Sequence, residues 1–104
     1  MSQGLAPSDL GDHRGHLALL VDAELPAGRV LELIRAHRSG SIRLRAEVFD
    51  EYAGSGVPAK KKSLAVGIRY AATDRTLTDH DVSKVRGGLL KRLEKELGAV
   101  LRGA

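Results

Sequence analysis

The sequence predicts one α+β domain with the element order βαββαβ, in which a four-stranded antiparallel sheet carries both helices on one face. Two patterns carry this prediction. Apolar and polar residues alternate in some segments, as in strands, and apolar residues recur every three or four positions in others, as in helices. The 104 residues suit one hydrophobic core. Because only 3% of the residues are aromatic, we expect that core to consist mainly of Leu, Val, Ile and Ala.

The first predicted strand is the apolar run LALLVD at residues 17–22. We assign residues 1–14 to a flexible lead-in or linker, since residues 1–12 are rich in Gly, Pro, Ser and Asp, and the folded domain to residues 15–104. A helix is expected after Pro26, which is tolerated at a helix start, and it should end near residues 37–38. Its expected apolar face consists of Ala27, Val30, Leu31 and Ile34.

Two further segments alternate apolar and polar residues as half-buried strands do. At 42–48 the residues expected to face inward are Ile42, Leu44, Ala46 and Val48, and those expected to face outward are Arg43, Arg45 and Glu47. At 63–71 the inward residues are Leu64, Val66, Ile68 and Tyr70, and the outward ones are Ser63, Ala65, Gly67 and Arg69. A polar loop at 50–62 joins the two strands.

The second helix has a clear predicted start at Thr78, an N-cap residue, with Asp81 three positions later as in a capping box. Its apolar stripe consists of Val82, Val85, Leu89, Leu93 and Leu97. Gly98 should end it, and residues 99–102 form a short last strand. The resulting order is that of the ferredoxin-like fold.

The charges suggest a polyanionic partner, because the chain has 17 Lys and Arg against 13 Asp and Glu and a pI near 9.8. Arginines can pair with phosphates and stack on bases, so an open sheet face that carries them is a candidate RNA-binding surface. We predict contacts by Arg43, Arg45 and Arg69, with Lys60, Lys61 and Lys62 as a basic rim. The alternative is an ordinary solvated surface. We expect no exposed aromatic residue on the central strands, which argues against RNA recognition in the manner of an RRM domain.

Catalytic and metal-binding patterns are weak. The chain has no cysteine, hence no disulfide and no thiolate metal site. His13 and His16 lie near Asp12, but a convincing further ligand is missing. No residues form a credible triad, so we expect neither a cofactor nor catalysis by this chain alone. No apolar run approaches the roughly 20 residues that cross a bilayer, and we expect a cytoplasmic protein with no membrane partner.

Four short pieces of the sequence occur together in one known family. They are FDEYAG at 49–54, GVP at 56–58, KSLA at 62–65, and DRTLTD at 74–79 followed by Val82. In this order and spacing they resemble the ferredoxin-fold anticodon-binding domain at the C-terminus of the phenylalanyl-tRNA synthetase β subunit, over about residues 17–102. The resemblance implies a non-catalytic module that docks on the anticodon stem-loop of tRNA-Phe. It also implies the rest of the synthetase as a partner if the chain is a fragment.

The match departs from the family at the first strand. The family has Pro and then Arg-Asp there, whereas this chain has Arg14 followed by Gly15. Two other functions stay open at this point. One is a free-standing ferredoxin-like domain used for protein–protein interaction, and the other is a small-ligand regulatory domain on the same fold.

Overall fold

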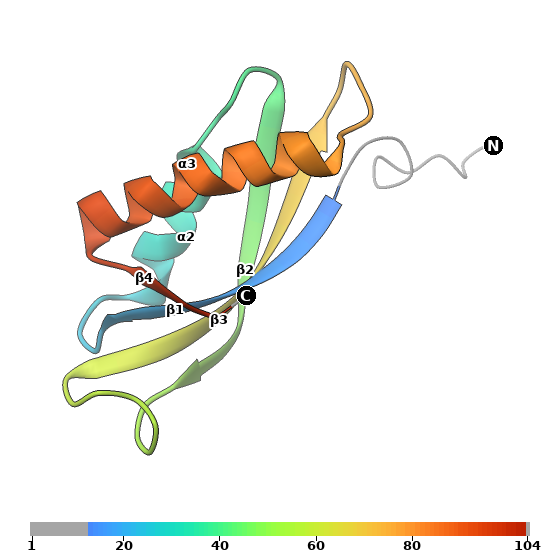
Figure 1. The fold of residues 1–104 in the computed structure, drawn as a ribbon. Coiled ribbons are helices and arrows are strands. Elements are labelled where there is room, and N and C mark those ends of the chain that lie inside the picture. Colours follow the sequence, from blue (N-terminus) through green and yellow to red (C-terminus); the bar gives the residue numbers. More distant parts are fainter. Residues whose placement is uncertain (1–12, 104) are drawn as a thin grey trace.

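The computed structural model describes residues 13–103, and its elements follow the predicted order. They are β1 (His13–Asp22), α2 (Ala27–Ala36), β2 (Ile42–Tyr52), β3 (Lys61–Ala72), α3 (Asp79–Leu97) and β4 (Val100–Gly103). The strands form one sheet in the order β2-β3-β1-β4, and every neighbouring pair is antiparallel. Both helices lie on one side of this sheet (Figure 1). The predicted ferredoxin-like fold is therefore confirmed.

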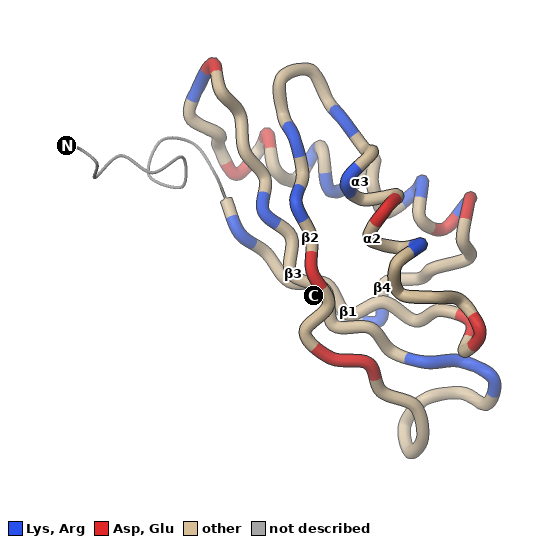
Figure 2. The backbone as a smooth tube through the Cα atoms, turned by 180° about the vertical axis from the view of Figure 1, so that it is seen from behind, with Lys and Arg blue, Asp and Glu red and all other residues tan. Residues whose placement is uncertain are grey.

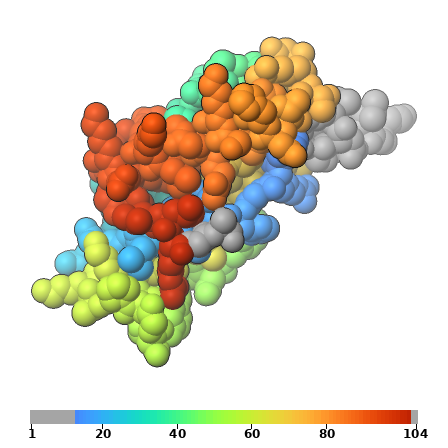
Figure 3. Space-filling view, viewed as in Figure 1, coloured from blue at the N-terminus to red at the C-terminus, as the bar shows by residue number. Residues whose placement is uncertain are grey.

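The core lies between the helices and the inner face of the sheet. The inward residues predicted for β3 are all buried, including Tyr70, which is 2% exposed. On α3 the buried residues are Val85, Leu89 and Leu93. On α2 they are Val30, Leu33 and Ile34; Leu33 was not part of the predicted apolar face, while Ala27 and Leu31 of that face are partly buried against the core. In the space-filling view α3 covers much of the sheet on this side (Figure 3).

Strand β1 begins four residues earlier than its apolar run indicates. It pairs with β3 along its whole length, from His13 opposite Tyr70 to Asp22 opposite Lys61. The Nε2 atom of His13 lies 2.8 Å from the carbonyl oxygen of Leu77. This contact connects the start of the strand to the loop before α3. Residues 13 and 14, which the sequence placed in the lead-in, are thus part of the sheet. The rest of the predicted lead-in lies outside the described residues.

A β-bulge in β2 changes which side chains face outward. Val48 pairs with Val66, but the next pair is Asp50 with Ala65, so Phe49 is an extra residue. Beyond the bulge the facing of the side chains is reversed, because residues directly opposite each other share a face. Tyr52, opposite Ser63, therefore lies on the same face as Ala65 and Gly67.

Helix α3 has the start and end that its sequence predicts. The Asp81 backbone N–H donates to Thr78 Oγ1 at 3.1 Å, and the Thr78 backbone N–H donates to Asp81 Oδ2 at 3.0 Å, which completes a capping box. Hydrogen bonds that the Asp81 carboxylate accepts from Thr78, first from its backbone N–H and then from its side chain, hold the pKa of Asp81 below its usual range. Gly98 ends the helix in the left-handed conformation, φ 67°.

Candidate nucleic-acid interface

Three arginines form a row across the sheet face that carries no helix. Arg14 on β1 is directly opposite Arg69 on β3, which is directly opposite Arg45 on β2. Arg43 lies two residues along β2 on the same face. Viewed from behind, these basic positions of the three strands lie at neighbouring points (Figure 2). The structure thus brings the three predicted arginines together and adds Arg14. Extending the alternation of β1 toward its N-terminus places Arg14 on this face.

The arginine row borders a shallow hollow of about 840 Å³. Its lining comes from β1, β2 and β3, and Arg35 of α2 joins it at the β2 edge. The Arg35 guanidinium donates to the carbonyl oxygen of Ala46 at 2.9 Å, so it also satisfies one acceptor of this edge strand. The hollow is open and wide, and its charged lining residues are four arginines and Glu47. It suits an extended anionic ligand better than a small enclosed one.

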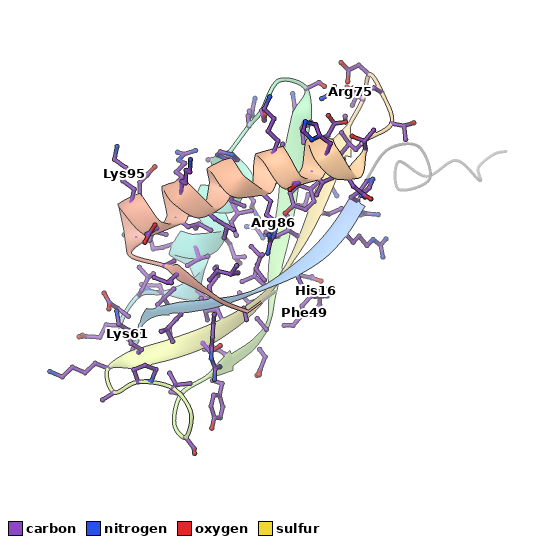
Figure 4. The ribbon with its side chains drawn as sticks, in the orientation of Figure 1. His16, Phe49, Lys61, Arg75, Arg86 and Lys95 are labelled. Atoms are coloured by element: carbon purple, nitrogen blue, oxygen red, sulfur yellow. The ribbon has the colours of Figure 1, made fainter. Side chains whose placement is uncertain are left out.

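Phe49 lies on this face, on the edge strand β2; the expectation of no exposed aromatic residue concerned the central strands, β3 and β1, whose aromatic residue Tyr70 is buried. Phe49 is 58% exposed, and its ring covers Gly67, where an added Cβ would overlap it. The centroid of the His16 ring is 5.4 Å from that of Phe49, with an interplanar angle of 38°. Figure 4 shows the two rings side by side. The predicted strand ended at residue 48, although continuing its alternation from Glu47 by two residues places Phe49 on this face.

A family model matches residues 11–102, and its description is "Ferredoxin-fold anticodon binding domain". This covers nearly the whole described chain, including all four strands. The chain belongs to this family. The description of the family is that of a binding module.

The similar curated proteins are phenylalanine–tRNA ligase β subunits. That of Methylococcus capsulatus is 43% identical over 86% of this chain, and that of Clostridium tetani is 42% identical over 83%. That of Geobacter metallireducens is 38% identical over 92% of this chain. The alignments cover only 11 to 12% of these relatives. The anticodon-binding domain described here therefore corresponds to a small part of each relative.

The three lysines of the predicted basic rim of the anticodon-binding domain differ in their exposure to solvent. Lys60 is exposed, and Lys61 Nζ is 2.7 Å from Asp22 Oδ1. Lys62 is only 7% exposed, and its Nζ is 2.9 Å from Glu51 Oε2. Lys62 thus faces the inner side of the sheet and is a poor candidate for a contact on the open face. RNA contact by the other five predicted residues stays a prediction.

The four sequence pieces that resemble the family contain residues with structural roles. Thr78 caps α3, and Asp74 accepts a hydrogen bond of 2.6 Å from the Ser41 hydroxyl, which joins two loops at one end of the sheet. At the other end, the Arg102 guanidinium donates to the carbonyl oxygen of Gly56 at 3.1 Å. The Tyr52 hydroxyl donates to the Ser55 carbonyl oxygen at 2.8 Å. These residues hold the loops, while the ring of Tyr52 is also 42% exposed on the open face.

Within residues 13–103 the two histidines of the sequence pattern have different surroundings, and Asp12 lies outside the described residues. His13 contacts the loop before α3, whereas His16 lies beside Phe49 on the open face. Within residues 13–103, no group of three or more potential His, Cys, Asp or Glu ligands lies close enough to hold a metal. In the same part of the chain, neither helix combines the length and apolar character needed to cross a membrane.

Proposed function

We propose that this anticodon-binding domain docks on the anticodon stem-loop of tRNA-Phe through its open sheet face. In this proposal the arginine row neutralises phosphates, and unstacked loop bases approach the sheet beside it. The domain supports phenylalanylation by a complete synthetase in the cytoplasm, and the aminoacylation chemistry belongs to other parts of that enzyme. The relatives are phenylalanine–tRNA ligase β subunits, and this supports the choice of tRNA-Phe.

The cross-strand arginine row is the observation that carries the proposal. Like charges directly opposite each other on a sheet destabilise it, so three adjacent arginines are a costly way to make a surface soluble. Alternating Lys and Glu would keep the surface polar without that repulsion. A polyanion whose phosphates lie along the row would remove the repulsion. This favours RNA binding over protein–protein interaction as the use of the open face.

Charge reversal on the open face tests the proposal directly. In filter-binding assays with the tRNA-Phe anticodon arm, we expect Arg43→Glu combined with Arg45→Glu to weaken binding at least about tenfold. The slope of log affinity against log salt should also become shallower by about 1.5, since two phosphate contacts are lost. Both arginines are exposed, so the fold should tolerate the changes.

The matched control is Lys84→Glu combined with Lys95→Glu. It changes the net charge equally, but both lysines are exposed on α3, on the helical side of the sheet. We expect this variant to bind nearly as tightly as the wild type. Equal weakening by the two double variants would show that net charge, rather than the arginine surface, governs binding, and the proposed surface would then be wrong.

A further inference from the structure

The Phe49 ring is held between two neighbours and is open to solvent elsewhere. It lies so close to Gly67 that an added Cβ there would overlap Cε2 and would be 2.8 Å from Cζ. The centroid of the His16 ring is 5.4 Å away, with the two rings tilted by 38°. Because 58% of Phe49 remains exposed, much of the ring is accessible to a ligand. A supported and accessible aromatic ring has the form of a stacking surface.

The ring lies next to the arginine row. His16, Gly67 and Glu47 are directly opposite one another on β1, β3 and β2. They lie two residues along the strands from Arg14, Arg69 and Arg45, which is ~6.6 Å. A nucleotide is long enough to place its base over one row and its phosphate over the other. The Glu47 carboxylate, exposed in the same row, can accept hydrogen bonds from N–H groups on a base edge.

We propose that Phe49, seated on Gly67 and flanked by His16, is a stacking platform for one unstacked base of the bound RNA, whose flanking phosphate lies on the arginine row. The inference rests on the proposed function and makes it more specific. Stacking on aromatic side chains is the general means by which proteins hold bases of single-stranded RNA. Gly67 has a defined part in the platform, because any larger residue there would displace the ring.

A purely structural role for Phe49 makes different predictions. Aromatic rings often cover glycines in sheets, and such a contact stabilises the strand pair. In that case the loss of the ring would lower stability and leave the affinity of the folded protein for RNA unchanged. Phe49→Leu and Phe49→Tyr therefore form a useful pair, since Leu removes the flat ring and Tyr keeps it.

The binding experiment compares these variants on the tRNA-Phe anticodon arm. We expect Phe49→Leu to weaken binding about tenfold and Phe49→Tyr to bind within about twofold of the wild type. The salt slope of Phe49→Leu should match the wild type, because its phosphate contacts remain. Gly67→Ala, which retains every charged and aromatic group, should weaken binding as Phe49→Leu does.

A spectroscopic measurement on the unmodified protein supports this test. Phe49 is the only phenylalanine of the chain, so selective isotope labelling of phenylalanine gives one ring in the NMR spectrum. On addition of the anticodon arm we expect upfield shifts of its ring protons and cross-peaks to protons of one base. This measurement needs no variant and does not depend on how well a variant folds.

The outcomes separate the two proposals. Wild-type affinity for Phe49→Leu, or Phe49 ring signals that do not change in the complex, would overturn the platform and leave the arginine surface standing. If the arginine variant binds normally while Phe49→Leu does not, the platform stands without the phosphate row. If the wild-type chain fails to bind the anticodon arm, both proposals are wrong.

Discussion

Lys61 and Lys62 are neighbours in the chain but have different surroundings. Lys61 is partly exposed and pairs with Asp22, whereas Lys62 is buried on the inner side and pairs with Glu51. The charge of Lys62 is thus used within the fold. A lysine that is both buried and paired has little freedom to contact a ligand.

Replacing Lys62 with Met tests this distinction. Met retains the apolar stem but loses the ion pair, so we expect the free energy of unfolding to fall by about 1 kcal/mol, because Glu51 is half-exposed and can regain its hydration. RNA affinity of the folded protein should change less than about twofold. Urea unfolding and filter binding measure the two effects.

Lys60→Met is the comparison for that variant, because Lys60 is exposed beside the same strand. Its stability should equal that of the wild type. Strong loss of RNA affinity in Lys62→Met with unchanged stability would contradict the inward placement of Lys62.

The positions of some residues could be predicted from the sequence, and those of others could not. Extending the alternation of β3 back from Leu64 places Lys62 on the inner face. The three lysines at 60–62 were instead assigned to the polar loop, because they form a basic run. Alternation continued from Glu47 would have placed Phe49 on the open face, but the predicted strand ended at residue 48. Tyr52 could not be placed by alternation, because the bulge before it adds one residue without a sign in the sequence.

At the scale of elements, α3 has two adjacent glycines in its middle, and Gly87 has the simpler surroundings. An added Cβ at Gly87 meets nothing within 4 Å, and the residue is exposed. Glycine in a helix interior costs about 1 kcal/mol relative to Ala, mainly through the backbone entropy of the unfolded chain. The helix is therefore less stable than its core contacts would allow.

We expect Gly87→Ala to raise the free energy of unfolding by about 1 kcal/mol, measured by urea or thermal denaturation. Gly98→Ala provides the opposite control, because Gly98 has a φ of 67° that a side chain disfavours. That variant should lose about 1 kcal/mol. A stability loss in Gly87→Ala would show that the middle of α3 requires the glycine for another reason.

The helices and strands of this protein could be predicted wherever apolar residues recurred with the full spacing of a helix or a strand. The capping box of α3 and the alternation of β2 and β3 gave the correct elements and faces. The start of β1 was missed because residues 13–16 contain no apolar side chain. That segment is a strand because of its pairing with β3 and the contact of His13 with Leu77, and such long-range contacts leave no local pattern.

At the scale of the whole molecule, His37 connects the two helices. It follows α2, and its ring contacts the Gly88 position of α3, where an added Cβ would be 3.7 Å from Nε2. Burial lowers the pKa of His37 below its ordinary value, and the nearby positive charge of Arg92 lowers it further. The folded protein thus prefers a neutral ring at the junction of the helices.

This preference gives stability a defined pH dependence. Above the ordinary histidine pKa of about 6.5, the neutral His37 ring makes its full contribution to the stability of the folded protein. As the pH falls from there toward the lowered pKa of the folded state, the unfolded chain binds the proton first and stability declines. We expect His37→Gln to show a smaller loss between pH 7 and pH 5 than the wild type in urea denaturation. Identical slopes for the two proteins would exclude His37 as a cause.

Under the proposed function, the arginine row would link folding to ligand binding. Like charges opposite each other weaken a sheet, and a polyanion bound along the row would offset this effect. Any ligand that binds only the folded state raises its stability in proportion to the logarithm of its concentration. On this proposal, the arginines together mean that the domain gives up stability in isolation for affinity in the complex.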